Sequence, residues 1–191
     1  MRAFGKWIGR ILFAAVLLIA AFLAFAPPVV ERLQNPIARH DPWPASPEAI
    51  ELHSALLIGD WHADSLLWKR DLLKKSRRGQ VDLPRLIEGN VALQDFTAGT
   101  KSPAGQNYEA NSSESFDNIT ALAIGQLWPV RTWDSLLQRA LYQAEKLHRF
   151  AERSDGKLRI IRTKSDLETV LSARANGERV VGAILGIEGA H

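Results

Sequence analysis

The sequence predicts an α/β domain with a parallel sheet, preceded by one N-terminal transmembrane helix. Short, almost wholly apolar segments alternate along the chain with segments of helical periodicity, which is the pattern of βαβ units. Near the N-terminus, residues 11–30 contain no charged residue and are just long enough to cross a bilayer as a helix. Of the 191 residues, 46% are hydrophobic and 24% are charged, a composition that excludes a disordered chain.

Three basic residues, Arg2, Lys6 and Arg10, precede the apolar run. By the positive-inside tendency, they keep residues 1–10 in the cytoplasm. Residues 11–30 would then form a signal-anchor helix whose partner is the lipid bilayer. The rest of the chain would face the periplasm or the exterior.

A cleaved signal peptide is the alternative to an uncleaved anchor. Ala24-Phe25-Ala26 resembles the small-x-small site of such peptides, and cleavage there would release a secreted protein. Pro27 would directly follow the cut, and its fixed φ and missing N–H disfavour an extended, protease-bound conformation. The apolar run is also longer than a usual signal peptide requires, so we expect the helix to be retained.

The segment 31–47 is rich in proline and predicts an extended linker. The folded domain, residues 48–191, is expected to begin just after Ser46. This serine is a suitable N-cap, with Pro47 at the first helical position and Glu48 in the first turn.

Four apolar segments in the domain predict the strands, and four segments with helical spacing or capping residues predict the helices that follow them. The predicted strands are Ala55–Asp60, Asn90–Phe96, Leu158–Arg162 and Val180–Ile187. The predicted helices are Asp82–Gly89, Asn118–Trp128, Ser135–Arg153 and Ser165–Ala175. The Gly/Ser/Asn-rich segment Thr97–Ser115 predicts a long loop.

Charge and cysteine content exclude several classes of function. The formal charge is +3, and three positive charges lie before the apolar run, so the domain itself is close to neutral. The run Lys74, Lys75, Arg77 and Arg78 is predicted to be a solvated loop, and no nucleic-acid partner is expected. Because the chain has no cysteine, it has neither disulfides nor a thiolate metal site, and any metal must bind to nitrogen and oxygen.

Candidate metal ligands follow the first predicted strand. His62 and Asp64 are two residues apart, so on an extended segment they point to the same side and can converge on one ion. Imidazole and carboxylate form the ligand set expected for zinc in a hydrolytic site. The alternative is a polar strand-to-loop turn without a metal.

Glu188 ends the fourth predicted strand and is the third candidate ligand. Gly182 and Gly186 precede it and allow a close approach of backbones. Because the carboxyl ends of parallel strands lie at one edge of the sheet, Glu188 is expected at the same edge as His62 and Asp64. The alternative is an edge glutamate that pairs with a lysine or an arginine.

Three sequence blocks resemble successive blocks of the renal (membrane) dipeptidase family, in the family's order. They are Ile58–Leu66 (IGDWHADSL), Gln80–Val91 (QVDLPRLIEGNV) and Gly186–His191 (GIEGAH). The resemblance covers the chain from about Ser46 to its last residue. One departure is Ala190, where the family usually has a second glycine.

The resemblance implies a (β/α)8 metallohydrolase barrel of the TIM type, with two zinc ions at its C-terminal face. It implies that His62 and Asp64 bind one zinc and that Glu188 bridges both as a catalytic carboxylate. The implied activity is hydrolysis of the peptide bond of dipeptides through a metal-bridging hydroxide. His191 is a candidate for a group that orients a metal ligand.

A complete barrel needs about 250 residues, so the resemblance also implies an incomplete domain. The remaining zinc histidines and the substrate-binding residues of the family are expected beyond residue 191. The chain alone is therefore expected to be inactive. Two alternatives stay open: a non-catalytic truncated remnant, or a metal-dependent amidohydrolase of another substrate class. The preferred dipeptide and the oligomeric state are left open as well.

Overall fold

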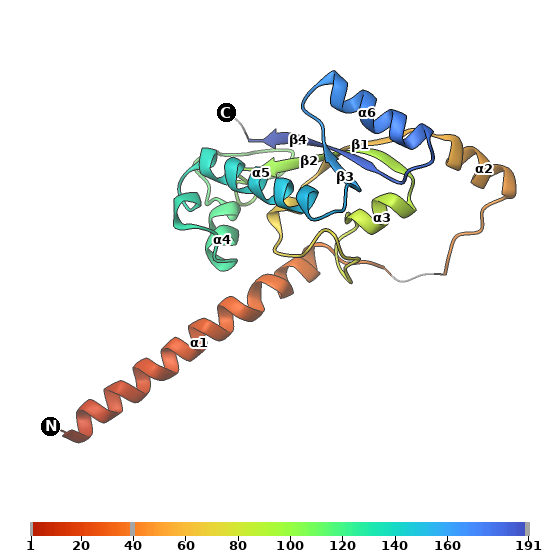
Figure 1. Cartoon of the computed structure of the whole chain (residues 1–191). Helices are drawn as coiled ribbons and strands as arrows, with labels where there is room; N and C mark the ends of the chain where they lie inside the picture. Colours follow the sequence, from red (N-terminus) through yellow and green to blue (C-terminus); the bar gives the residue numbers. More distant parts are fainter. Residues whose placement is uncertain (1, 39–40, 190–191) are drawn as a thin grey trace.

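The computed structural model describes residues 2–38 and 41–189 and consists of a long N-terminal helix attached to an α/β domain (Figure 1). The helices are α1 (Arg2–Gln34), α2 (Pro47–Ala55), α3 (Leu83–Glu88), α4 (Asn118–Gly125), α5 (Leu136–Glu152) and α6 (Lys164–Ala175). The strands are β1 (Ile58–Ala63), β2 (Val91–Gly99), β3 (Leu158–Ile160) and β4 (Val181–Glu188). Two short 3-10 helices, η1 (Ser65–Leu67) and η2 (Val130–Thr132), follow β1 and α4.

Helix α1 contains the predicted span and extends beyond it. The segment Lys6–Gln34 is long and apolar enough to cross a membrane or to act as a signal sequence. Pro27 and Pro28 lie inside the helix, which ends at Gln34 rather than near Val30. The prediction of a linker from residue 31 was therefore wrong for its first four residues, because tertiary contacts of Glu31 hold the last turn against the domain.

The sheet has four parallel strands in the order β1-β2-β4-β3, which confirms the predicted parallel α/β fold. It is open, and no closed barrel is present among residues 2–38 and 41–189. Consecutive strands of a (β/α)8 barrel would be neighbours, whereas here β4 lies between β2 and β3. Strand β3 pairs only with the first residues of β4, from Val181 to Ala183.

Three strands lie further along the chain or extend further than predicted. Strand β1 begins at Ile58, because α2 continues to Ala55, and it extends to Ala63. Strand β2 continues to Gly99, and β4 ends at Glu188. His62, which was expected just after the first strand, therefore lies inside β1, and the strand backbone sets the direction of its side chain.

Capping residues set the helix starts as predicted, with one exception. The side chains of Ser46, Asp82 and Ser135 each accept a hydrogen bond from a first-turn N–H of α2, α3 and α5. Helix α6 begins instead after Thr163, which forms a capping box with Asp166. This pair satisfies two backbone donors, so the helix begins at Lys164, one residue before the predicted start at Ser165.

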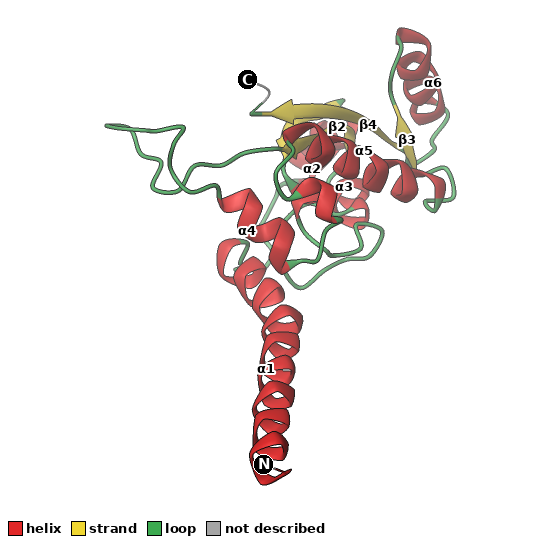
Figure 2. Cartoon of the chain, turned by 90° about the vertical axis from the view of Figure 1, so that its left-hand side faces the viewer, coloured by secondary structure: helices red, strands yellow, loops and turns green. Residues whose placement is uncertain are grey.

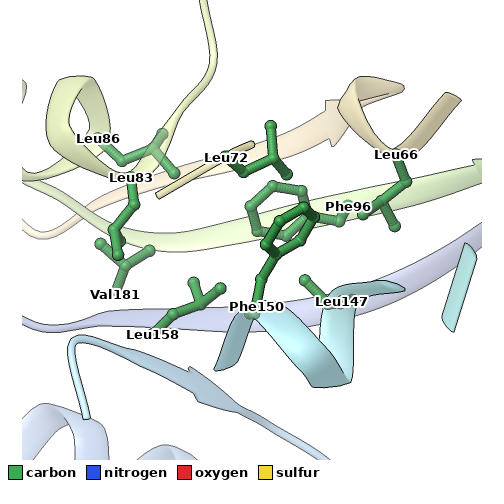
Figure 3. Packing of buried hydrophobic residues seen from close by; sticks show 10 residues of the cluster. Leu66, Leu72, Leu83, Leu86, Phe96, Leu147, Phe150, Leu158 and Val181 are labelled. Carbon is green, nitrogen blue, oxygen red and sulfur yellow. The ribbon is translucent and has the colours of Figure 1, made fainter. Parts of the chain in front are cut away.

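The hydrophobic core lies between the sheet and the helices α3 and α5, on one side of the sheet (Figures 2 and 3). Phe96 of β2 lies beside Leu147 and Phe150 of α5, and Val181 of β4 lies beside its strand partner Leu158. The other members of this cluster are Leu66, Leu72, Leu83, Leu86, Leu158 and Ala183. Helix α6 packs beside β3 on the other side, through a smaller cluster that includes Val170 and Val180.

A buried lysine lies in this layer and makes stability depend on pH. Lys146 of α5 donates hydrogen bonds to the carbonyl oxygens of Leu66 (2.5 Å) and Trp68 (2.8 Å). Burial, followed by the positive charge of Arg149, lowers the pKa of Lys146 to about 7. In the unfolded chain a lysine keeps its proton up to about pH 10.4, so above about pH 7 the unfolded state binds more protons than the folded state.

We therefore expect Lys146→Met to remove part of the pH dependence of stability. Relative to the variant, the free energy of unfolding of the wild-type chain should rise by up to about 1.4 kcal/mol per pH unit between about pH 7 and about pH 10. Urea denaturation at several pH values, in one detergent, measures this difference. Parallel pH profiles for the two proteins would contradict the lowered pKa.

Candidate metal centre

The three predicted ligands meet at the carboxyl edge of the sheet. His62 lies near the end of β1, Asp64 is the cap of η1 just after that strand, and Glu188 is the last residue of β4. Strand β2 lies between β1 and β4 in the sheet, so the side chains of His62 and Glu188 meet across the end of β2. The structure thus brings together all three residues that the sequence singled out.

The distances fit a single bound ion. His62 Nε2 lies 3.3 Å from Asp64 Oδ2 and 3.4 Å from Glu188 Oε2. One ligand atom from each of the three residues lies within 4.8 Å of the others. In a tetrahedral zinc site with bonds of about 2.0–2.2 Å, neighbouring ligand atoms are about 3.3–3.6 Å apart. The two measured separations therefore match the edges of such a site.

The chemistry of the donor set also fits a metal. It offers one imidazole nitrogen and carboxylate oxygens, and Asp64 Oδ1 is buried with no hydrogen-bond partner among the described residues. The side chains of His62, Asp64 and Glu188 are 58%, 37% and 55% exposed, respectively, so both an ion and a substrate can reach them.

Negative charge dominates the electrostatics of the site. The hydrogen bond to Asp64 raises the pKa of His62 above its ordinary value, and the charges of Asp64, Glu188 and Asp95 act in the same direction against partial desolvation. The backbone N–H of His62 donates a hydrogen bond to Asp60 Oδ1 (3.1 Å), which orders the end of β1. A cation at this place would replace the proton that the carboxylates favour.

Asp95 of β2 belongs to the surroundings of the site and was not predicted. Its Oδ1 atom is buried without a hydrogen-bond partner among the described residues. A methyl group on Gly186 of β4 would lie only 2.7 Å from Asp95 Oδ2, so the glycine makes room for this carboxylate. The close approach at Gly186 is therefore made by a side chain, whereas the sequence predicted a close approach of backbones. The sequence signal that could have identified Asp95 was an acidic residue in the middle of a predicted strand.

The backbone at Glu188 is fixed by Thr100, at the end of β2. Thr100 donates from its N–H (3.1 Å) and its hydroxyl (2.9 Å) to the carbonyl oxygen of Glu188, and the hydroxyl also lies 3.0 Å from the carbonyl oxygen of Gly189. Gly189 has φ +77°, in the left-handed region that favours glycine. The predicted residues Ala190 and His191 lie outside the described residues, and so does any role of His191.

A cleft of about 540 Å³ opens beside the cluster, between α1 and α4. Asp64 and Glu188 line one part of it, together with Lys101, and Phe22 and Val30 of α1 line another. A second hollow of about 240 Å³ borders His62 on the other side, near residues 79–81. The cluster therefore faces space large enough for a small peptide, with an apolar wall that α1 provides.

Helix α1 is fixed to the domain by a buried carboxylate. Glu31 is 2% exposed, and its Oε1 forms an ion pair with Arg70 Nε (3.1 Å) while its Oε2 accepts a hydrogen bond from Arg78 Nε (2.5 Å). The N–H of Gly79 donates to the carbonyl oxygen of Asn35, just after the helix (2.9 Å). The prediction of a solvated basic loop was therefore wrong for Arg78, because its side chain forms an ion pair with the buried Glu31 of α1.

No family model, no curated protein and no solved structure matches the chain.

Proposed function

We propose that the protein is a membrane-anchored, zinc-dependent dipeptidase in which His62 and Asp64 bind one zinc ion and Glu188 bridges it to a second. The observation that carries this proposal is the convergence of the three side chains, with 3.3 and 3.4 Å between ligand atoms, at the carboxyl edge of a parallel sheet. The resemblance of three sequence blocks to renal dipeptidases supports the choice of reaction.

Zinc suits this site better than the other common divalent cations. Magnesium and calcium prefer six or more oxygen ligands, whereas an imidazole nitrogen favours zinc or another transition metal. When bound, zinc would lower the pKa of a coordinated water and polarise the scissile carbonyl group. The three protein ligands would leave coordination positions open for water and substrate, as catalytic zinc sites do.

The residues of the chain have separable roles in this proposal. His62, Asp64 and Glu188 hold the metal, and Thr100 fixes the backbone from which Glu188 projects. Lys101 lines the neighbouring cleft and provides a cation suited to the carboxylate of a dipeptide. Its ammonium group donates to the carbonyl oxygen of Ser113 (3.0 Å), and a substrate carboxylate would compete for it.

The (β/α)8 barrel is also a proposal. It is supported by parallel strands with a candidate site at their carboxyl ends. Because β3 pairs only with residues 181–183, the remainder of β4 has no partner on that side among the described strands. A further barrel strand could pair there, and β3 would then be an addition to the barrel order.

Retention of α1 as a membrane anchor is supported by its contacts with the domain. Cleavage after Ala26 would remove Phe22 and Ala26 from the wall of the cleft and leave a free N-terminus close to the buried Glu31. The mass of the protein purified from membranes tests this point. A mass that lacks residues 1–26 would identify a signal peptide and a secreted enzyme instead.

Hydrolysis assays on a protein that contains this chain test the function. Zinc-loaded protein should hydrolyse unmodified dipeptides, and chelation of the metal should abolish this activity. Cleavage of N-acylated amino acids or lactams in place of dipeptides would favour an amidohydrolase of another substrate class. A protein that binds no zinc at all would favour the non-catalytic remnant.

Zinc affinity should depend on pH because His62 binds zinc only when deprotonated. Its pKa is raised, so protons compete with zinc up to a higher pH than for an ordinary histidine, whose pKa is about 6.5. We expect the apparent affinity to fall as the pH is lowered from about 8 to about 5.5 and protonated His62 accumulates. Competition titrations against a chromophoric chelator at several pH values measure this effect. Affinity that is constant over that range would contradict His62 as a ligand.

A further inference from the structure

An exposed group of apolar side chains lies where α4 ends and η2 begins. Ile124, Leu127 and Val130 are 38%, 60% and 70% exposed, respectively, within seven consecutive residues. We call these three residues the apolar tip. Exposed apolar groups that are close together mark contact surfaces for proteins or membranes more often than single exposed residues do.

The backbone holds Leu127 outward. Its neighbours Gln126 and Trp128 are 4% and 3% exposed, and Gln126 Nε2 donates to the carbonyl oxygen of Leu67 (2.6 Å). Leu127 itself has φ +57°, a left-handed conformation that is uncommon for a leucine. The fold therefore places an apolar side chain in solvent at a strained position, where a polar residue or glycine would cost less.

The apolar tip lies beside α1, within the stretch that would cross the bilayer. Gly125, the last residue of α4, faces Pro27, and a methyl group on this glycine would lie 3.9 Å from Pro27 Cγ. Figures 1 and 2 show α4 close to the half of α1 that adjoins the domain. At about 1.5 Å per residue, Pro27 lies about 24 Å along the helix from Ile11, whereas the hydrocarbon core is about 30 Å thick.

If residues 11–30 span the core, α4 therefore meets α1 before α1 has left it. The end of α4 would lie at the outer boundary between the acyl chains and the headgroups. Water would not surround the apolar tip at this depth. Its exposed side chains would have lipid beside them, so the strain at Leu127 would be offset by transfer of apolar surface out of water.

We propose that the apolar tip inserts into the outer leaflet of the bilayer beside α1, so that the domain rests on the membrane surface instead of hanging from a flexible tether. This inference depends on the anchoring role proposed for α1. Its consequence is that the cleft next to the metal ligands, which α1 and α4 border, opens close to the lipid headgroups.

Site-specific labelling of the full chain tests this inference, because the protein has no cysteine of its own. Leu127→Cys and Val130→Cys carry an environment-sensitive fluorophore, and the proteins are reconstituted in phosphatidylcholine vesicles with or without a lipid-borne quencher. We expect a blue-shifted emission that the quencher reduces at both positions. Ile50→Cys on α2, 60% exposed and outside the apolar tip, is the matched control and should show neither effect.

Phe13→Cys, within the apolar run of α1, separates failure of this inference from failure of the anchor. If position 13 is quenched by lipid and positions 127 and 130 behave like position 50, the apolar tip does not touch the membrane and the inference is wrong. If position 13 is not quenched, α1 does not span the bilayer, and the inference is overturned together with its premise. A blue shift at position 127 without lipid quenching would indicate a contact with protein and would also overturn it.

Discussion

Replacing His62 with alanine is expected to lower the zinc affinity of the chain at least about 100-fold, since loss of a group that only supports a ligand already costs about 10–100-fold. The variant would keep two carboxylates, which bind transition metals less strongly than a set with imidazole. Competition with a chromophoric chelator measures the affinity. Any hydrolysis of dipeptides should be lost with the metal.

The matched control is His53→Ala, which removes another exposed histidine, on α2 and away from the cluster. It should leave zinc binding unchanged. The side chain of His62 is 58% exposed, so its removal should not unfold the protein, and circular dichroism should be the same for both variants. Equal zinc affinity of His62→Ala and the wild-type chain would show that the metal, if any, binds elsewhere.

Replacing Arg139 with methionine is expected to lower the free energy of unfolding by about 3–5 kcal/mol, the cost of breaking a buried ion pair by removal of one partner. Arg139 is 2% exposed and forms an ion pair with Asp117 (2.5 Å). It also donates to the carbonyl oxygens of Thr100, Thr132 and Trp133 and to the hydroxyl of Thr120. Methionine fills much of the volume but satisfies none of these acceptors.

This substitution should also affect the metal centre. Arg139 holds the carbonyl oxygen of Thr100 (2.7 Å), and Thr100 holds the backbone of Glu188. Urea denaturation in detergent measures stability, and Arg131→Met, at an arginine of η2 whose side chain is 48% exposed, is the control. The control should change stability by less than about 0.5 kcal/mol. A loss of less than about 1 kcal/mol in the free energy of unfolding of Arg139→Met would mean that the hydrogen bonds and the ion pair of Arg139 do not stabilise the fold.

Local sequence signals predicted most of the helices and strands, and they predicted that His62, Asp64 and Glu188 lie close together. Ser46, Asp82 and Ser135 are caps because each supplies a side-chain oxygen to a first-turn N–H, a property of the residue type that needs no tertiary context. The proximity of His62 and Glu188 could be predicted because both lie near the carboxyl ends of strands, and parallel strands end at one edge of the sheet.

Features that depend on distant contacts were not predicted. Helix α1 continues beyond Val30 to Gln34, where Glu31 forms ion pairs with Arg70 and Arg78, about 40 residues or more along the chain, and the local sequence does not indicate these contacts. The order of the strands, with β3 outside β4, was likewise not predicted. Asp95 was overlooked because its importance comes from its neighbours Gly186 and His62 on other strands.

The zinc X-ray absorption spectrum of the full chain tests the proposed metal centre most directly. We expect a first shell of nitrogen and oxygen at about 2.0–2.1 Å, with the outer-shell scattering of one imidazole and no sulfur. His62→Ala should remove the imidazole signal, and His53→Ala should keep it. A spectrum without imidazole, or one that His62→Ala leaves unchanged, would contradict a zinc site built from His62, Asp64 and Glu188.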